Sequence, residues 1–111
     1  MSKKQSTNMP EYHNLDRGRL FIPDKCRHHF KCSLGLTLDD QKRFIAVQPY
    51  EESRVKLDSR GRLTIPKALR DEANIRDVVV IRFISCLHDY FEIWNPVSWE
   101  KETQTQSSTL R

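Results

Sequence analysis

The chain has 111 residues, enough for one compact domain or for two small units that share a core. Hydrophobic residues make up 37% of it and charged residues 31%, and no apolar run approaches the roughly 18 residues that a membrane helix needs. The composition therefore excludes a membrane-spanning helix, and the net charge of +4 is a mild indication of a polyanionic partner.

The polar, basic stretch 1–12 has no apolar segment behind it, so we expect a disordered arm and not a secretory signal. The three cysteines, Cys26, Cys32 and Cys86, are odd in number and scattered, which is typical of free thiols and not of a disulfide framework. We therefore expect a cytoplasmic protein.

One segment of the sequence occurs twice. Leu15–Pro23 recurs as Leu57–Pro66 with one additional residue, Ser59, and in each copy an arginine lies four positions beyond the proline. Counting that arginine, nine residue types match in order, whereas two unrelated stretches of this length share about one. We therefore expect two tandem units, at 13–52 and 53–102, followed by a disordered polar tail at 103–111.

In the first unit, the repeated segment predicts a strand, a turn and a second strand, followed by a short helix. Beyond it, Ser33–Leu38 alternates apolar and polar residues, as a half-buried strand does. The polar stretch Asp39–Lys42 predicts a turn, and Arg43–Val47 predicts the return strand of a hairpin.

The second unit has the same order with stronger signals. Asp58–Gly61 predicts a turn between two strands, because Asp and Ser bond their own backbone and glycine accepts a positive φ. Arg62–Ile65 alternates with period two, which places Leu63 and Ile65 on one face. The later elements are a short helix at Lys67–Ala73, begun by Pro66, and strands at Val78–Ile84 and Tyr90–Trp94 joined by a hairpin turn at Leu87–Asp89.

These elements predict a mainly β fold with short helices, in which each unit reads ββαββ. A unit of about 40 residues buries too little apolar surface to be stable alone. We therefore expect the two units to interleave around one core, related by a pseudo-twofold axis, as a dimer fused into one polypeptide.

The second copy of the repeat, Asp58–Arg70, resembles the signature of the AbrB and MraZ swapped-hairpin proteins, and Phe91–Glu100 looks like the end of an MraZ repeat. The resemblance extends from residue 15 to about residue 102. It implies a swapped-hairpin β-barrel that binds double-stranded DNA sequence-specifically as a transcriptional regulator, in association with the nucleoid. The first copy departs from the family in its shorter turn, so its contact with DNA stays open. The first unit also lacks the longer helical segment that follows each repeat in MraZ proteins, so we do not expect their ring-shaped oligomers, and the assembly of fused pairs into another homo-oligomer stays open.

Positive charge is concentrated in the repeated segments. Residues 53–70 hold six Lys or Arg side chains against the single acid Asp58, a net +5, and the corresponding stretch 15–31 has a net +3. Such clusters favour duplex DNA, because neutralised phosphates release counterions and arginine can fork onto guanine. We expect base contacts from Arg17, Arg19, Arg60 and Arg62, and phosphate contacts from Lys25, Arg27, Lys67 and Arg70.

Other chemistry has less support in the sequence. Cys26, His28, His29 and Cys32 match no familiar zinc spacing, so we expect no metal and no cofactor, and the role of the two histidines beside the DNA face stays open. The chain offers no nucleophile beside a base and no phosphate-binding glycine loop, so we do not expect an enzyme. Two alternatives to a regulator remain: an antitoxin-like module that binds DNA and a toxin, and an oligomerisation barrel without DNA binding.

Overall fold

The computed structural model describes residues 10–84 and 89–109 of the protein, without the side chains of residues 25–26 and 105–109. The architecture is mainly β with few and mostly short helices, which confirms this part of the sequence prediction. In chain order the elements are β1 (Glu11–Asn14), β2 (Arg19–Phe21), α1 (Asp24–Arg27), the 3-10 helix η2 (His28–Phe30), β3 (Leu34–Leu38), β4 (Phe44–Pro49), β5 (Arg62–Thr64), α2 (Lys67–Glu72), β6 (Val78–Phe83), β7 (Phe91–Trp94) and α3 (Pro96–Thr109).

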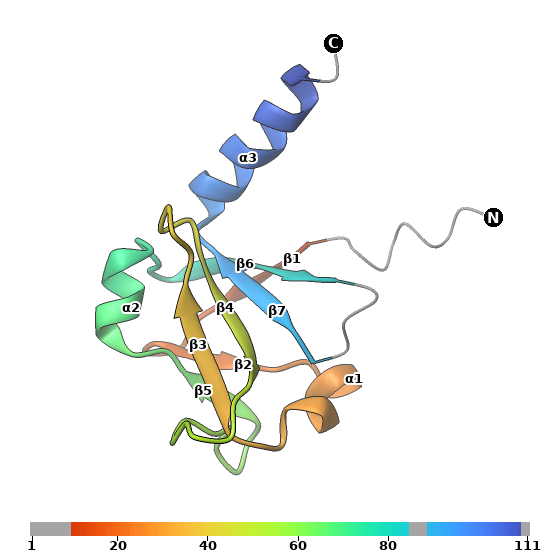
Figure 1. The fold of residues 1–111 in the computed structure, drawn as a ribbon, viewed down its shortest axis with the longest axis vertical. Helices are drawn as coiled ribbons and strands as arrows, with labels where there is room; N and C mark the ends of the chain where they lie inside the picture. Colours follow the sequence, from red (N-terminus) through yellow and green to blue (C-terminus); the bar gives the residue numbers. More distant parts are fainter. Residues whose placement is uncertain (1–9, 85–88, 110–111) are drawn as a thin grey trace, which may run out of the picture.

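The strands form two sheets in which every pair is antiparallel (Figure 1). The larger sheet has the order β1-β6-β7-β4-β3, and the smaller one consists of β2 and β5. The predicted hairpins β3–β4 and β6–β7 lie side by side in the larger sheet, joined by the pairing of β4 with β7. Both sheets therefore combine strands from the N-terminal and the C-terminal part of the chain.

The apolar core follows from the strand alternation. Leu63 and Ile65 are fully buried while Thr64 between them is exposed, as the period of two predicts. Leu20 lies opposite Leu63 at the centre of the smaller sheet and is equally buried. These side chains belong to one continuous core with residues of every strand except β1: Leu34, Ile45, Val47, Val79, Ile81, Phe91 and Ile93 are among its other members.

The turn between β3 and β4 lies at residues 39–42, as the sequence predicts. The Asp39 carboxylate accepts hydrogen bonds from the backbone N–H groups of Gln41 and Arg43, both at 3.2 Å, and from Arg43 Nε at 2.7 Å. The side-chain bond from Arg43 is the largest of the causes that hold the pKa of Asp39 below its ordinary value. Arg43 Nη1 also lies 3.1 Å from Glu102, which ties the turn to α3.

Helix α3, Pro96–Thr109, is not predicted from the sequence. It continues to Thr109, so the expectation of a disordered tail from residue 103 is wrong for residues 103–109, while residues 110–111 lie outside the described part. Asn95 caps the helix, because its Oδ1 accepts bonds from the N–H groups of Val97 at 2.7 Å and Ser98 at 3.1 Å. Among the described residues, no helix combines the length and the apolar character that crossing a membrane requires.

Two strand boundaries also differ from the prediction. β1 begins at Glu11, inside the stretch 1–12 expected to be a disordered arm, because its backbone pairs with β6; residues 1–9 lie outside the described part, as do Leu87 and His88 of the predicted hairpin turn. The strand that the sequence predicts before the turn Asp58–Gly61 does not form, so the predicted order ββαββ is wrong for the second unit. The N–H of Val55 bonds to Ser53 Oγ at 3.0 Å, so it does not take part in a strand ladder.

The centre of the smaller sheet carries a stability prediction. Leu63→Ala removes a fully buried side chain, and it should lower the free energy of unfolding by about 2–5 kcal/mol because a cavity remains. Urea unfolding measures the difference. Val97→Ala on α3, where the side chain is 60% exposed, is the control and should change stability by less than about 0.5 kcal/mol. Equal effects of the two substitutions would contradict the packing described.

Candidate nucleic-acid interface

The first repeated turn, Asp16–Arg19, lies at one end of the smaller sheet and leads into β2. Its two end residues exchange backbone hydrogen bonds of 2.9 and 3.0 Å, which close the turn. Arg17 and Gly18 both have positive φ, of 56° and 80°. Glycine takes this conformation without strain, whereas Arg17 adopts it with its side chain exposed.

The second turn, Asp58–Arg62, contains the additional Ser59 and is organised by a carboxylate. Oδ1 of Asp58 accepts bonds from the backbone N–H groups of Arg60 and Arg62, both at 2.9 Å, and Oδ2 accepts one from Arg62 Nε at 2.7 Å. The backbone bond from Arg62 is the largest of the causes that hold the pKa of Asp58 below its ordinary value. The backbone of Arg60 is therefore held, while its side chain is exposed.

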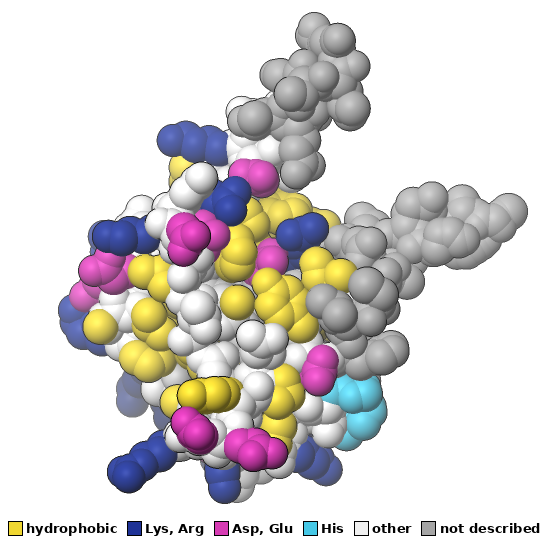
Figure 2. All heavy atoms as spheres, in the orientation of Figure 1, with side chains coloured by type: hydrophobic (Ala, Val, Ile, Leu, Met, Phe, Trp, Pro, Cys, Tyr) yellow, Lys and Arg dark blue, Asp and Glu magenta, His cyan; other side chains and the backbone are white. Residues whose placement is uncertain are grey.

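The antiparallel pairing of β2 with β5 sets the two turns at opposite ends of one ribbon. Arg17 and Arg60 each precede their strand by two residues, and the rise of a strand places them up to about 20 Å apart. Neither side chain forms an ion pair with a residue in the described ranges 10–84 and 89–109. Figure 2 shows Lys and Arg side chains gathered along the lower and left margin of the molecule, where β2, β5 and α2 lie in Figure 1.

Four further cations of the predicted interface already have carboxylate partners within their own turn or helix. These partners are Asp16 at 3.7 Å from Arg19, Asp24 at 2.7 Å from Arg27, Asp58 at 2.7 Å from Arg62 and Asp71 at 2.9 Å from Lys67. The ion pairs of Arg19 and Lys67 are accessible to solvent and contribute little to stability, so these two cations can exchange their carboxylate for a phosphate at small free-energy cost. The side chain of Arg62 is only 15% exposed, and its carboxylate partner also organises the turn.

Arg27 and Arg70, the arginines four positions beyond each proline, are half-buried. Arg70 Nε at 2.9 Å and Arg27 Nη2 at 3.1 Å each donate to the backbone carbonyl five residues earlier. Each guanidinium also lies against the glycine of a turn, Arg70 against Gly18 and Arg27 against Gly61. Both side chains thus have partners inside the protein, which the sequence did not indicate.

A comparison with protein families finds a match that includes the second turn. The model of the MraZ protein family, described as antitoxin-like, matches residues 49–110, more than half of the chain. The chain belongs to the MraZ family. The resemblance seen in the sequence is confirmed, and the matched range covers β5, α2, β6, β7 and α3. MraZ proteins are a family of regulators with an AbrB-like fold and not a family of enzymes.

Each turn of this MraZ-family protein borders a hollow with basic residues that the repeat did not single out. The hollow beside the first turn, about 330 Å³, is lined by Arg17, Lys67, Arg70 and Arg76 with Asp71 and Asp77. The hollow beside the second turn, about 250 Å³, is lined by Arg27, Lys31 and Lys56 with Asp58. Lys31 and Lys56 contribute to the charge of the repeated segments, but the exposed Arg76 lies outside them and carried no signal.

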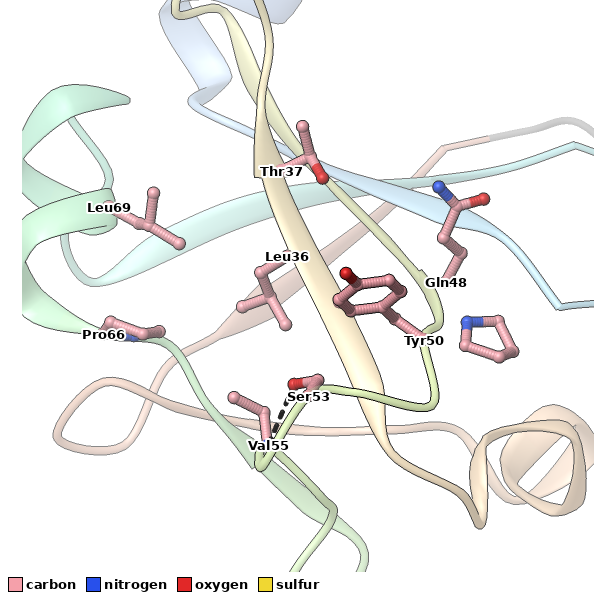
Figure 3. Close-up of a pocket in the computed structure, with 10 residues that line it drawn as sticks. Leu36, Thr37, Gln48, Tyr50, Ser53, Val55, Pro66 and Leu69 are labelled. Carbon is pink, nitrogen blue, oxygen red and sulfur yellow. Dashed lines mark hydrogen bonds between the residues drawn. The ribbon is translucent and has the colours of Figure 1, made fainter.

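A larger hollow of about 510 Å³ beside β3 has a different character (Figure 3). Leu36, Tyr50 and Val55 line it together with Pro66 and Leu69 from the start of α2. No charged side chain of the described residues borders it. Thr37, Gln48 and Ser53 also line it, so this hollow is uncharged but not wholly apolar.

The histidine and cysteine cluster of the first unit lies next to Arg27. His28 and His29 are neighbours in η2, with ring centroids 3.9 Å apart, and Cys32 is exposed. The side chains of Lys25 and Cys26 are outside the described part. Within that part, no group of three or more His, Cys, Asp or Glu residues is arranged to hold a metal ion.

The second turn carries a pH prediction. The folded-state pKa of Asp58 is lowered from its ordinary 3.8, so the carboxylate stabilises the turn above that pH and loses this effect as the pH falls through the folded pKa. Asp58→Ala should therefore lower the Tm at pH 7, and the difference from wild type should shrink below pH 3.8. Asp58→Asn keeps one acceptor oxygen and should lose less. A Tm difference independent of pH would contradict this role.

Proposed function

We propose that the protein is a sequence-specific DNA-binding transcriptional regulator of the AbrB/MraZ type, which contacts double-stranded DNA with its two repeated turns. The observation that carries the proposal is the placement of Arg17 and Arg60 at opposite ends of one ribbon, exposed and without an acidic partner among the described residues. Membership in the MraZ family supports it. On this account the protein acts in the cytoplasm, in association with the nucleoid.

The cations of the interface suit two different uses. Within residues 10–84 and 89–109, no ion pair engages the guanidinium groups of Arg17 and Arg60, which can donate two parallel hydrogen bonds to guanine O6 and N7 in the major groove. The exposed cations of the two hollows suit phosphates, because each neutralised phosphate releases counterions from the duplex. These are Lys31 and Lys56 beside the second turn and Lys67 and Arg76 beside the first; Arg19, Arg62 and Lys25 complete the proposed interface.

We further propose that the chain consists of two tandem units, which form a swapped-hairpin barrel about a pseudo-twofold axis. The pairing registers support this. In the repeat, Arg19 is equivalent to Arg62 and Phe21 is equivalent to Thr64. Exchanging equivalent residues converts the pair Arg19–Thr64 into the pair Phe21–Arg62, and both pairs occur in the smaller sheet. The pairs between β4 and β7 are likewise exchanged among themselves. The axis would make each turn the counterpart of the other.

The combined substitution Arg17→Ala and Arg60→Ala tests the proposal. It should weaken binding to a preferred duplex by about 1–3 kcal/mol for each arginine that contacts a base, because alanine cannot donate the two parallel hydrogen bonds of the guanidinium. Preferred sequences are first selected from a pool of random duplexes, and affinities are then measured at several salt concentrations. Wild type should enrich defined sequences and lose affinity steeply as salt rises.

A matched control removes the same charge elsewhere. Lys42→Ala with Lys101→Ala changes exposed residues of the β3–β4 turn and of α3, which lie at the opposite end of the molecule from β2 and β5 (Figure 1). This variant should bind nearly as well as wild type. Absence of enrichment, or equal weakening in the two double variants, would remove the DNA proposal and favour a protein partner of the antitoxin kind.

The additional Ser59 predicts an asymmetric DNA site, because the backbone conformation at Arg17 differs from that at Arg60: only Arg17 has a positive φ. Arg17→Ala and Arg60→Ala, made singly, should each relax the sequence preference in one half of the site, and to different extents. Selection from the duplex pool with each variant measures which positions lose preference. Identical effects on both halves of a perfect palindrome would contradict unequal turns.

A further inference from the structure

We propose that Arg27 and Arg70 are positioning residues, each of which holds the turn of the opposite half of the chain, and that neither is a phosphate ligand. The halves are residues 13–52, with the first turn and Arg27, and residues 53–102, with the second turn and Arg70. That the turns contact DNA rests on the proposed function. The contacts of Arg27 and Arg70 with the turns do not rest on it, because they lie within the chain.

The contact in one direction joins Arg70 to the first turn. A β-carbon built on Gly18 would lie 2.8 Å from Cζ, 2.9 Å from Nη2 and 3.0 Å from Nε of Arg70, so the guanidinium occupies the space that any side chain there would need. Nε of the same group donates to the carbonyl of Ile65 at 2.9 Å. The N–H of Ile65 in turn donates to the carbonyl of Gly18 at 2.9 Å. Arg70 therefore bridges α2, the end of β5 and the first turn.

The contact in the other direction repeats this arrangement with the halves exchanged. A β-carbon on Gly61 would lie 2.6 Å from Cζ of Arg27. Arg27 donates to the carbonyl of Ile22 from Nε at 3.3 Å and from Nη2 at 3.1 Å, and the N–H of Ile22 donates to the carbonyl of Gly61 at 3.0 Å. Two separate occurrences in one chain show that the arrangement belongs to the motif and not to one local packing accident.

The chemistry of the guanidinium explains why arginine occupies both positions. It is planar, so it can lie flat on a glycine backbone while its edge donates to a carbonyl, and the compact ammonium of lysine cannot do both. Gly18 and Gly61 are buried and have φ of 80° and 79°, a conformation that favours glycine for a second reason. Each glycine adjoins a turn arginine, so the opposite half of the chain fixes the backbone that presents Arg17 or Arg60.

Nuclear magnetic resonance tests the contact without DNA. In wild type, the Nε–H of Arg70 should show Overhauser contacts to the α-protons of Gly18 and slow exchange with solvent. Arg70→Lys and Arg70→Ala should both shift the amide resonances of Gly18 and Arg17, and both should lower the Tm by about 5 °C. Arg76→Ala removes a charge from the same hollow and should move neither the Gly18 resonance nor the Tm.

DNA binding then separates a positioning residue from a phosphate ligand. A positioning role predicts that Arg70→Lys and Arg70→Ala lose affinity alike, roughly tenfold, with the dependence on salt unchanged. A phosphate ligand predicts that lysine restores binding, that alanine lowers the salt slope by about 0.9, and that Gly18 keeps its resonance. The latter pattern, or missing Overhauser contacts in wild type, overturns the proposal. If no duplex is enriched, the proposed function fails while the resonances still decide the contact.

Discussion

The pairing of β2 with β5 is the contact on which the rest of the molecule depends. It consists of only three residue pairs, and it brings together the two copies of the repeated segment, with the buried Leu20 and Leu63 facing each other at its centre. Because the strands are antiparallel, each turn ends beside the helix that follows the other strand. The charged ends of the ribbon, and the contacts of Arg27 and Arg70 across it, are consequences of this one pairing.

The arginines of the motif illustrate how one residue type serves several purposes within a few positions. In the second copy, Arg60 is exposed, Arg62 is bound to the turn carboxylate, and Arg70 is bonded to the backbone of its own half. All three add to the same positive field, which attracts a polyanion at long range. Of the three, Arg60 alone has a guanidinium without a partner in the described part of the chain. The number of basic residues therefore indicates the strength of the long-range attraction for a polyanion. It does not indicate how many side chains would contact the polyanion directly.

The sequence predicts most of this fold because its signals are local. Period-two alternation identifies the buried Leu63 and Ile65, and the turn residues place the β3–β4 hairpin at residues 39–42. Helix α3 was not predicted, although Asn95 caps its start, because its mostly polar residues lack the apolar periodicity that identifies a helix. The partner of Arg70 could not be foreseen at all, since Gly18 is distant in sequence and becomes its neighbour only when β2 pairs with β5.

Ser59 lengthens one turn and leaves the other unchanged, so the two ends of the ribbon are not equivalent. A regulator made of two identical chains fits a symmetric site in either orientation. A single chain with unequal ends can instead distinguish the two directions along a duplex. The sequence of its site would then fix which face and which flank of the bound protein point toward the start of a transcript, so that proteins binding upstream and downstream would meet different surfaces.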